Sequence, residues 1–307
     1  MMKLNRVAAI VLILLAVFST GVLAQEAKGN ALVLQTDFGL KDGAVSAMKG
    51  VAIGVDADLR IFDLTHEIPA YNIWEASYRL MQTASYWPAG TVFVSVVDPG
   101  VGTDRKSVVV KTKTGHYFVT PDNGTLTLIE ESMGISEVRE IDENINRLPG
   151  SSDSYTFHGR DVYAYTGARL AAKAITFEQI GPVVNREIVK IGYQKAVMQG
   201  DAVLGNIPIL DIQYGNVWTN IDKKLIDALN IKKNDLLKVE IYNKGNRVYQ
   251  GTIPYVNSFG DVPDGKPLAY ANSLMQLSFA LNMDSFSAVH KVYSGPEWTV
   301  KVQKVSK

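Results

Sequence analysis

The sequence predicts an α/β protein of two domains, a larger amino-terminal α/β domain and a smaller β-rich domain at the carboxyl end. Two observations lead to this prediction. Between residues 30 and 185, strand-like apolar runs alternate with helix-like segments, which is typical of a parallel or mixed sheet covered by helices. Between residues 201 and 305, short strand-like runs follow one another with one helical segment among them, and residues 186–200 form the predicted linker.

The elements of the amino-terminal domain are predicted from their apolar patterns. The run Val92–Val97 is almost continuously β-branched, as expected of a strand that is buried on both faces. The predicted order is strand Ala31–Gln35, helix Gly43–Gly54, strand Leu59–Leu64, helix Ile73–Tyr86, strand Val92–Val97, strand Ser107–Lys111 and strand Tyr117–Thr120.

The carboxyl-terminal domain is predicted from shorter apolar runs. With 307 residues, of which 47% are hydrophobic, the chain is large enough to bury a sizeable core and to divide into two domains. The predicted elements are strands Ala202–Ile207 and Ile209–Gln213, helix Lys223–Leu229, and strands Leu236–Tyr242 and Trp298–Val302.

Residues 1–24 have the features of a cleavable secretory signal peptide. Met1–Arg6 is basic, Val7–Val17 is apolar, and Val22–Ala24 is a small-x-small cleavage site before Gln25. The apolar stretch is shorter than the roughly 20 residues that span a bilayer, so an uncleaved anchor is the less favoured alternative. We therefore expect a periplasmic or secreted protein without a stable membrane anchor.

Composition excludes several kinds of function. Lys and Arg number 31 and so do Asp and Glu, and no basic run stands out, so nucleic acid is not an expected partner. The chain has no cysteine. Disulfides, thiolate nucleophiles and cysteine-ligated metals are therefore excluded.

Two short polar segments follow predicted strands or turns and carry the most reactive side chains. Asp98–Arg105 and Phe157–Asp161 supply carboxylates, two guanidinium groups and an imidazole. Such groups are costly to bury unless paired, and the ligand crevice of an open α/β sheet lies beyond the carboxyl ends of its strands. The segments therefore indicate a site of chemistry, although Asp98-Pro99-Gly100 could also be an ordinary turn.

Four further polar segments lie at the ends of predicted strands. Asp37 could accept hydrogen bonds from both hydroxyls of a ribose, or it could stabilise a turn. Asp63 and His66 could begin a metal site, but no His-x-x-x-His pair or third His accompanies them, and a structural hydrogen bond between them suffices. Pro121–Gly124 predicts a turn, although its Asn123 could also face the crevice. Asp211–Asn220, with its amides and aromatic rings, suits either a planar ligand such as a nucleobase or a hairpin.

Taken together and in order, these segments give the chain a resemblance to the S-adenosyl-L-methionine (SAM) hydroxide adenosyltransferases, which are related to the fluorinase and chlorinase enzymes. The resemblance extends from about Ala31 to about Lys301, and although each piece is weak alone, their shared order is specific. The matching pieces are Thr36–Gly39, Asp63–Pro69, Asp98–Thr103 with Arg105, Pro121–Gly124, Phe157–Asp161, Gly215–Asn220 and Asn272–Ser273.

The resemblance implies a Rossmann-like α/β domain, a β-barrel-like carboxyl-terminal domain and a homotrimer whose active sites lie between subunits. It also implies that water or hydroxide attacks the ribose C5′ of SAM and releases adenosine and L-methionine, without cofactor or metal. The residues that it implies for positioning the water are Asp98, Arg105 and His158. Those that it implies for substrate binding are Asp37 on the ribose hydroxyls, Tyr71 beside the ribose, Asp211 on the methionine amine, Asn216 near the adenine and Ser273 at the methionine carboxylate.

Differences from the halide-using relatives favour hydroxide as the nucleophile. Those enzymes have a Tyr where this chain has Asp98, and the fluorinase has a Ser where it has Gly159. A carboxylate would repel a halide ion, whose pocket needs neutral hydrogen-bond donors. The segment between Val110 and Tyr117 also lacks the loop insertion of the halide enzymes.

Three features depart from the family pattern, and one of them is that Tyr165 and Thr166 stand where a Pro is common after the Phe157–Asp161 segment. After Ser273 the family usually has a Gly two residues on, followed by a Tyr, whereas this chain has Met275 and Gln276. The predicted export also separates the protein from the cytosol, where SAM is chiefly found. An exported binding protein for adenosine-like nucleosides, without significant turnover, is therefore the alternative function, and a purely structural trimer is a third.

Overall fold

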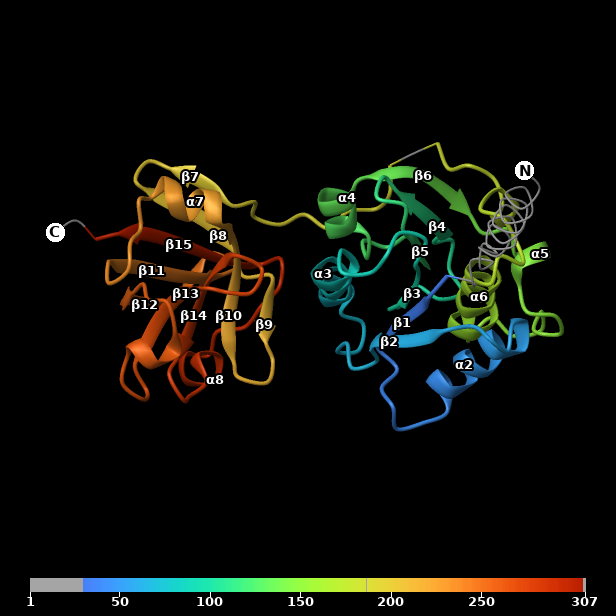
Figure 1. Ribbon diagram of the computed structural model, residues 1–307, viewed down its shortest axis with the longest axis horizontal. Coiled ribbons are helices and arrows are strands. Elements are labelled where there is room, and N and C mark those ends of the chain that lie inside the picture. Colours follow the sequence, from blue (N-terminus) through green and yellow to red (C-terminus); the bar gives the residue numbers. More distant parts are fainter. Residues whose placement is uncertain (1–29, 186, 306–307) are drawn as a thin grey trace, which may run out of the picture.

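The computed structural model describes residues 30–185 and 187–305, so the predicted signal peptide lies outside the described residues. Figure 1 shows a group of elements around a mixed sheet and a group of antiparallel strands, joined by an extended segment. The predicted α/β fold with a smaller β-rich part at the carboxyl end is confirmed. Within the described residues, no helix has the length and apolar character needed to cross a bilayer.

The amino-terminal sheet has six strands in the order β2-β1-β3-β5-β4-β6. Strand β1 pairs in parallel with β2 and β3, β3 pairs in parallel with β5, and β4 runs antiparallel to β5 and β6. The carboxyl ends of β1, β2 and β3 therefore lie at one edge, where polar segments follow them. The strands are β1 (Leu32–Thr36), β2 (Ile61–Thr65), β3 (Val92–Val96), β4 (Ser107–Thr112), β5 (Tyr117–Pro121) and β6 (Ile135–Glu140).

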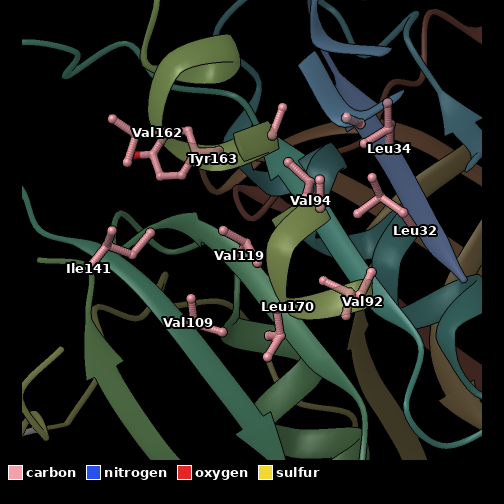
Figure 2. Packing of buried hydrophobic residues seen from close by; sticks show 14 of the residues in the cluster. Leu32, Leu34, Val92, Val94, Val109, Val119, Ile141, Val162, Tyr163 and Leu170 are labelled. Carbon is pink, nitrogen blue, oxygen red and sulfur yellow. The ribbon is translucent and has the colours of Figure 1, made fainter. Parts of the chain in front are cut away.

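Helices cover both faces of this sheet because alternate strand residues point to opposite sides. Leu32 and Val94 belong to the core beneath α2 (Ala44–Val55), the π-helical turn η1 (Gly159–Ala164) and α6 (Tyr165–Ala171), shown in part in Figure 2. Val33 and Phe93 belong to the core beneath α3 (Ile73–Ala84) and α4 (Thr127–Met133) on the other face. Two short helices, α5 (Glu143–Asn146) and η2 (Glu178–Ile180), complete the domain.

Helix α6 lies close to the sheet at Gly167. A Cβ atom on Gly167 would be 2.4 Å from Cγ2 of Val94, so only glycine allows this approach. Because η1 continues directly into α6, the same contact also fixes the distance between η1 and the end of β3.

The carboxyl-terminal domain consists of two antiparallel sheets around one apolar core. Their orders are β13-β14-β10-β9 and β12-β11-β15-β8-β7. The strands are β7 (Val197–Gln199), β8 (Ala202–Asn206), β9 (Ile209–Asp211), β10 (Asn216–Asp222), β11 (Leu236–Asn243), β12 (Asn246–Pro254), β13 (Pro267–Ala271), β14 (Gln276–Leu281) and β15 (Trp298–Lys304). The helices are α7 (Lys223–Ala228), η3 (Phe259–Asp261) and α8 (Phe286–His290).

The two domains meet through α3. The indole Nε1 of Trp74 donates a hydrogen bond to the carbonyl of Pro208 at 2.9 Å, and Nη2 of Arg79 donates one to the carbonyl of Leu210 at 3.3 Å. Trp74 also packs against Ile209 in a small apolar cluster. These contacts join the amino-terminal domain to β9.

The predicted elements of the amino-terminal domain are all present, with bounds that differ by one or two residues. In the carboxyl-terminal domain the prediction was incomplete. The segment that suggested either a nucleobase site or a hairpin contains the β9–β10 hairpin, and β12, β13 and β14 were not identified. Strand β7 lies within the segment predicted as the linker.

Candidate active site

An ion pair between Asp98 and Arg105 forms just beyond the end of β3. Nε of Arg105 donates to Oδ1 of Asp98 at 2.8 Å and Nη2 donates to Oδ2 at 2.5 Å, a two-point contact that fixes both planar groups. The side chains are only 5% and 11% exposed, respectively. The turn between them brings the two residues together, with Gly102 at φ 77° in the left-handed region that favours glycine.

Ser107 and Tyr163 complete the hydrogen bonding of this pair. Nη1 of Arg105 donates to Oγ of Ser107 at 2.9 Å, and the Tyr163 hydroxyl lies 3.0 Å from that Oγ and 3.4 Å from Oδ2 of Asp98. Burial raises the pKa of Tyr163 far above its ordinary value, and the nearby Asp98 raises it further, so the phenol stays protonated. Burial is the largest single influence on the pKa of Arg105 and opposes its charge, but the hydrogen bonds with Asp98, together with the electrostatic effects of Tyr163, Asp98 and Glu143, raise its pKa overall.

The imidazole of His158 lies against this ion pair and is only 5% exposed. Its Nδ1 is 3.0 Å from Nη2 of Arg105, and its Nε2 is 3.1 Å from Nη2 of Arg147. Burial lowers the pKa of His158 below the ordinary value, Glu143 opposes that change, and the two guanidinium charges add to it. The ring is therefore neutral near pH 7.

Four of the residues that the sequence singled out line one cavity of 250 Å³ beside the ion pair: Asp37, Tyr71, Asp98 and His158. The backbone N–H of Tyr71 donates to Oδ2 of Asp37 at 2.8 Å, and Tyr71 adopts a left-handed φ of 68°. Phe38 and Phe157 form apolar parts of the cavity wall. The third predicted water-positioning residue, Arg105, lies behind Asp98 through the ion pair.

A chain of hydrogen bonds joins the ends of β1 and β2 and holds Asp37 in place. Oγ1 of Thr36 lies 2.8 Å from Nδ1 of His66, whose Nε2 lies 3.0 Å from Oδ1 of Asp63. Lys49 donates to the other oxygen of Asp63 at 2.6 Å, and the backbone N–H of Phe38 donates to Oγ1 of Thr36 at 3.2 Å. If His66 carries its proton on Nε2, that nitrogen donates to Asp63 and Nδ1 accepts from the hydroxyl of Thr36, so each contact joins one donor and one acceptor.

The contact between Asp63 and His66 is thus a structural hydrogen bond, one of the two interpretations that the sequence left open. Across residues 30–185 and 187–305, no group of three or more His, Cys, Asp or Glu is arranged to hold a metal ion.

Asn123, in the predicted turn, also makes a structural hydrogen bond. Its side chain donates to the carbonyl of Val97 at 2.9 Å and supports the backbone just before Asp98.

The predicted binding residues of the carboxyl-terminal domain line two other cavities. Asp211 and Asn216 line a cavity of 660 Å³, and Nδ2 of Asn216 donates to Oδ2 of Asp211 at 3.2 Å. Ser273 lines a third cavity, of 480 Å³, beside α3. A single chain therefore brings the predicted residues of the amino-terminal domain together. Asp211 and Asn216 lie in a second cavity, and Ser273 lies in a third.

Met275 has a left-handed φ of 58°, and it stands where the resemblance led us to expect glycine. A residue with a side chain pays roughly 1–2 kcal/mol for that conformation. The side chain at position 275 therefore adds strain to the backbone between β13 and β14.

A guanidinium group from outside the two polar segments lies beside His158. Arg160 of the Phe157–Asp161 segment turns to its neighbour Asp161, with Nε donating to Oδ1 at 2.6 Å. Arg147 takes the place beside the ring instead. The sequence analysis missed Arg147 because it belongs to no polar segment at a strand end. Its only local signal is Glu143 four residues earlier.

Comparison with known proteins identifies the family. Residues 32–181 match the SAM hydroxide adenosyltransferase N-terminal domain, and residues 205–299 match the SAM hydroxide adenosyltransferase C-terminal domain. A relative from Methanocaldococcus jannaschii, named (R)-S-adenosyl-L-methionine hydrolase, is 37% identical over 220 residues, which cover 70% of this chain and 74% of the relative. The chain belongs to the SAM hydroxide adenosyltransferase family, as the resemblance predicted.

Two further matches extend over more of the chain. A fluorinase from Actinopolyspora mzabensis is 25% identical over 289 residues, which cover 86% of this chain and 94% of that enzyme. The crystal structure of an uncharacterized conserved protein from Thermotoga maritima superimposes with a TM-score of 0.80 at 33% identity, covering 89% of this chain and 99% of that one.

Replacing Thr36 by Val tests the hydrogen-bond chain behind Asp37. The buried Nδ1 of His66 and the backbone N–H of Phe38 each lose their partner, so we expect the free energy of unfolding to fall by about 1–3 kcal/mol. The same change at Thr252, which is exposed on β12, should alter it by less than about 0.5 kcal/mol. Urea denaturation measures both, and equal effects of the two changes would contradict the account.

Proposed function

We propose that this protein hydrolyses SAM to adenosine and L-methionine through attack of water on the ribose C5′. The observation that carries the proposal is the buried cluster of Asp98, Arg105 and His158, in which Asp98 and His158 line a cavity, in a member of this family. Two properties of the cluster suit the reaction: a permanently charged donor that can hold an oxygen, and a neutral imidazole that can accept a proton.

The reaction balances with groups that the chain supplies. The water oxygen forms a bond to C5′ while the C5′–S bond breaks and its electron pair returns to sulfur. The sulfonium cation thereby becomes a neutral thioether, and the proton lost by the water passes to His158. Arg105 keeps its own protons and stabilises hydroxide character on the attacking oxygen. Holding that oxygen in line with the departing sulfur can supply roughly 7 to 11 kcal/mol. The proposal needs neither a metal ion nor a cofactor.

The binding roles follow the same proposal. Asp37 would accept hydrogen bonds from the ribose hydroxyls, since one of its oxygens is held by the backbone of Tyr71 and the carboxylate lines the cavity. Tyr71 would lie beside the ribose. In the carboxyl-terminal domain, Asp211 would bind the methionine amine, Asn216 the adenine, and Ser273 the methionine carboxylate.

Water is favoured over a halide ion at this site. The carboxylate of Asp98 lines the cavity and would repel an anion. At Gly159 a side chain would meet the Phe38 ring, because an added Cβ would lie 3.0 Å from its Cε2 and Cζ atoms.

We infer that the complete active site forms between subunits of a homotrimer. The catalytic cavity and the Asp211 cavity have different linings within one chain, yet both hold residues proposed to bind the same substrate. Exposed apolar side chains line each of them: Tyr71 and Val101 in the first, and Ile212, Tyr214 and Met283 in the second. Their burial against a second subunit would favour assembly.

Mixed assemblies of two inactive variants test the intersubunit site. Asp98→Ala and Asp211→Ala chains each carry one defect, so each alone should be inactive. In mixed trimers, some sites receive both intact halves, and random mixing in equal amounts should restore about a quarter of the unmodified activity. Sites formed within single subunits would give no recovery, and sedimentation that shows only monomers would contradict the trimer.

The predicted signal peptide suggests where the reaction takes place. A chain that begins at Gln25 after cleavage would act in the periplasm or outside the cell, on SAM that has left the cytosol. The tests of function therefore use the chain from Gln25 onward.

Chromatography of the products tests the proposed activity. The chain from Gln25 should convert SAM to adenosine and methionine at a rate independent of chloride. His158→Gln should lower kcat by at least about 100-fold because the proton acceptor is lost. Asp98→Asn should also abolish turnover, whereas Asp104→Asn, in the exposed part of the same turn, should leave it unchanged. Tight binding of SAM without products would favour the exported nucleoside-binding protein instead.

A further inference from the structure

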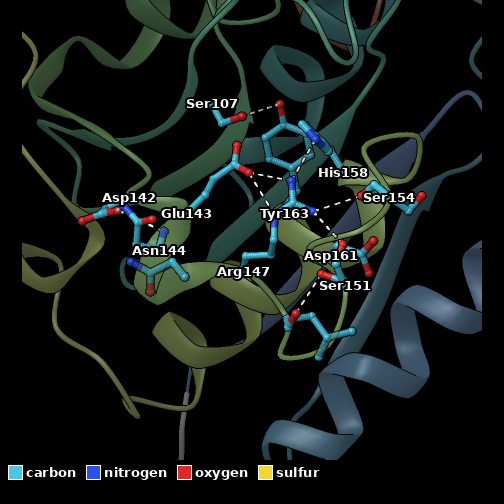
Figure 3. A network of polar contacts seen from close by, with 12 residues as sticks. Ser107, Asp142, Glu143, Asn144, Arg147, Ser151, Ser154, His158, Asp161 and Tyr163 are labelled. Atoms are coloured by element: carbon cyan, nitrogen blue, oxygen red, sulfur yellow. Dashed lines mark hydrogen bonds and ion pairs between the residues drawn. The ribbon is translucent and has the colours of Figure 1, made fainter.

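Arg147 holds a position that the proposed reaction has not yet used. Figure 3 shows its guanidinium group between the carboxylate of Glu143 and the ring of His158. Nε and Nη2 of Arg147 donate to Oε2 of Glu143 at 3.0 and 2.6 Å, and Nη1 donates to the carbonyls of Ser151 and Ser154 at 3.4 and 3.3 Å. The guanidinium also lies 4.8 Å from the centre of the Tyr155 ring. Arg147 is thus held from several sides and is only 9% exposed.

His158 is contacted by more hydrogen-bond donors than its ring can accept from. A neutral imidazole has one N–H group and one lone pair, whereas both guanidinium groups beside it can only donate. Nη2 of Arg105 faces Nδ1, and Nη2 of Arg147 faces Nε2. Only one of these contacts can be a hydrogen bond at a time. A protonated ring could accept neither and would place a third positive charge between the other two.

The charges around the ring balance as long as the ring is neutral. Asp98 pairs with Arg105 on one side, and Glu143 pairs with Arg147 on the other. The two tyrosines that face this cluster are Tyr155 and Tyr163, of which Tyr163 is held protonated by burial. Glu143 is 34% exposed, so it can be changed with little disturbance of packing.

We propose that Arg147, held in place by Glu143, is a positioning residue that keeps the imidazole of His158 neutral and therefore able to take the proton of the attacking water. This inference rests on the proposed function for its catalytic meaning, but the protonation state of the ring can be measured without turnover. Burial and the two guanidinium charges already lower the pKa of His158, in agreement with this role.

Two variants that each neutralise one member of the pair should act in opposite directions. Arg147→Gln removes a positive charge beside the ring and should strengthen proton binding by His158 about tenfold. Glu143→Gln removes a negative charge and should weaken it. Arg147→Lys keeps the charge and should stay close to the unmodified protein, and the double variant should lie between the two single variants.

Titration of the histidine ring protons by NMR measures these effects directly. The chain has four His residues, and the signal of His158 is the one that disappears in His158→Gln. In parallel, the acid limb of kcat/KM should move to higher pH in Arg147→Gln and to lower pH in Glu143→Gln, since the neutral ring is the proton acceptor. A purely structural role would lower activity without moving this limb.

The outcomes separate this inference from the proposed function. An unchanged pKa of His158 in Arg147→Gln, or a change in the same direction in both single variants, would overturn the inference even if SAM is hydrolysed. Opposite changes would support it, and would do so even if the unmodified protein fails to release adenosine, a result that would overturn the proposed function alone. Should Arg147→Gln not fold, Glu143→Gln still decides through the sign of its effect.

Discussion

The ion pair between Asp98 and Arg105 is the interaction on which the rest of the site depends. Both side chains are almost entirely buried, and leaving either one without its partner would typically cost about 3–5 kcal/mol. The pair also determines the direction in which Arg105 donates its remaining hydrogen bonds. Because one hydrogen of Arg105 Nη2 is held by Asp98, the other can point toward His158. Ser107 accepts from Nη1 of Arg105, and the Tyr163 hydroxyl contacts both Ser107 and Asp98, so these contacts further restrict the group.

The proposed chemistry follows from an excess of hydrogen-bond donors around His158. Two guanidinium groups face a ring that has one lone pair in its neutral form, so the cluster favours an oxygen that can both accept from a guanidinium group and donate to the ring. Water has both abilities. The Thr36–His66 hydrogen bond, on the neighbouring strand ends, is a contrasting case in which donors and acceptors match and the group serves to hold Asp37.

The sequence allowed the α/β fold, the family and the amino-terminal set of site residues to be predicted, because parallel strands bring their polar ends to one edge of the sheet. Asp37 and Asp98, which follow β1 and β3, were singled out in this way, whereas His158 lies before η1 and was singled out by its polar segment and by the family resemblance. The roles of all three stay predictions. Arg147 could not be singled out, since it reaches His158 through the path of the chain after α5 rather than from a strand end. The separation of Asp211 from Ser273 was equally hidden, because sequence order does not show which cavity a residue will line.

The central claim is that a water molecule held by Asp98, Arg105 and His158 attacks the ribose carbon. Hydrolysis of SAM in water enriched in oxygen-18, followed by mass spectrometry of both products, tests it most directly. The account predicts that adenosine gains one heavy oxygen and that methionine gains none. Adenosine without the label, or cleavage at another carbon attached to the sulfur, would contradict it.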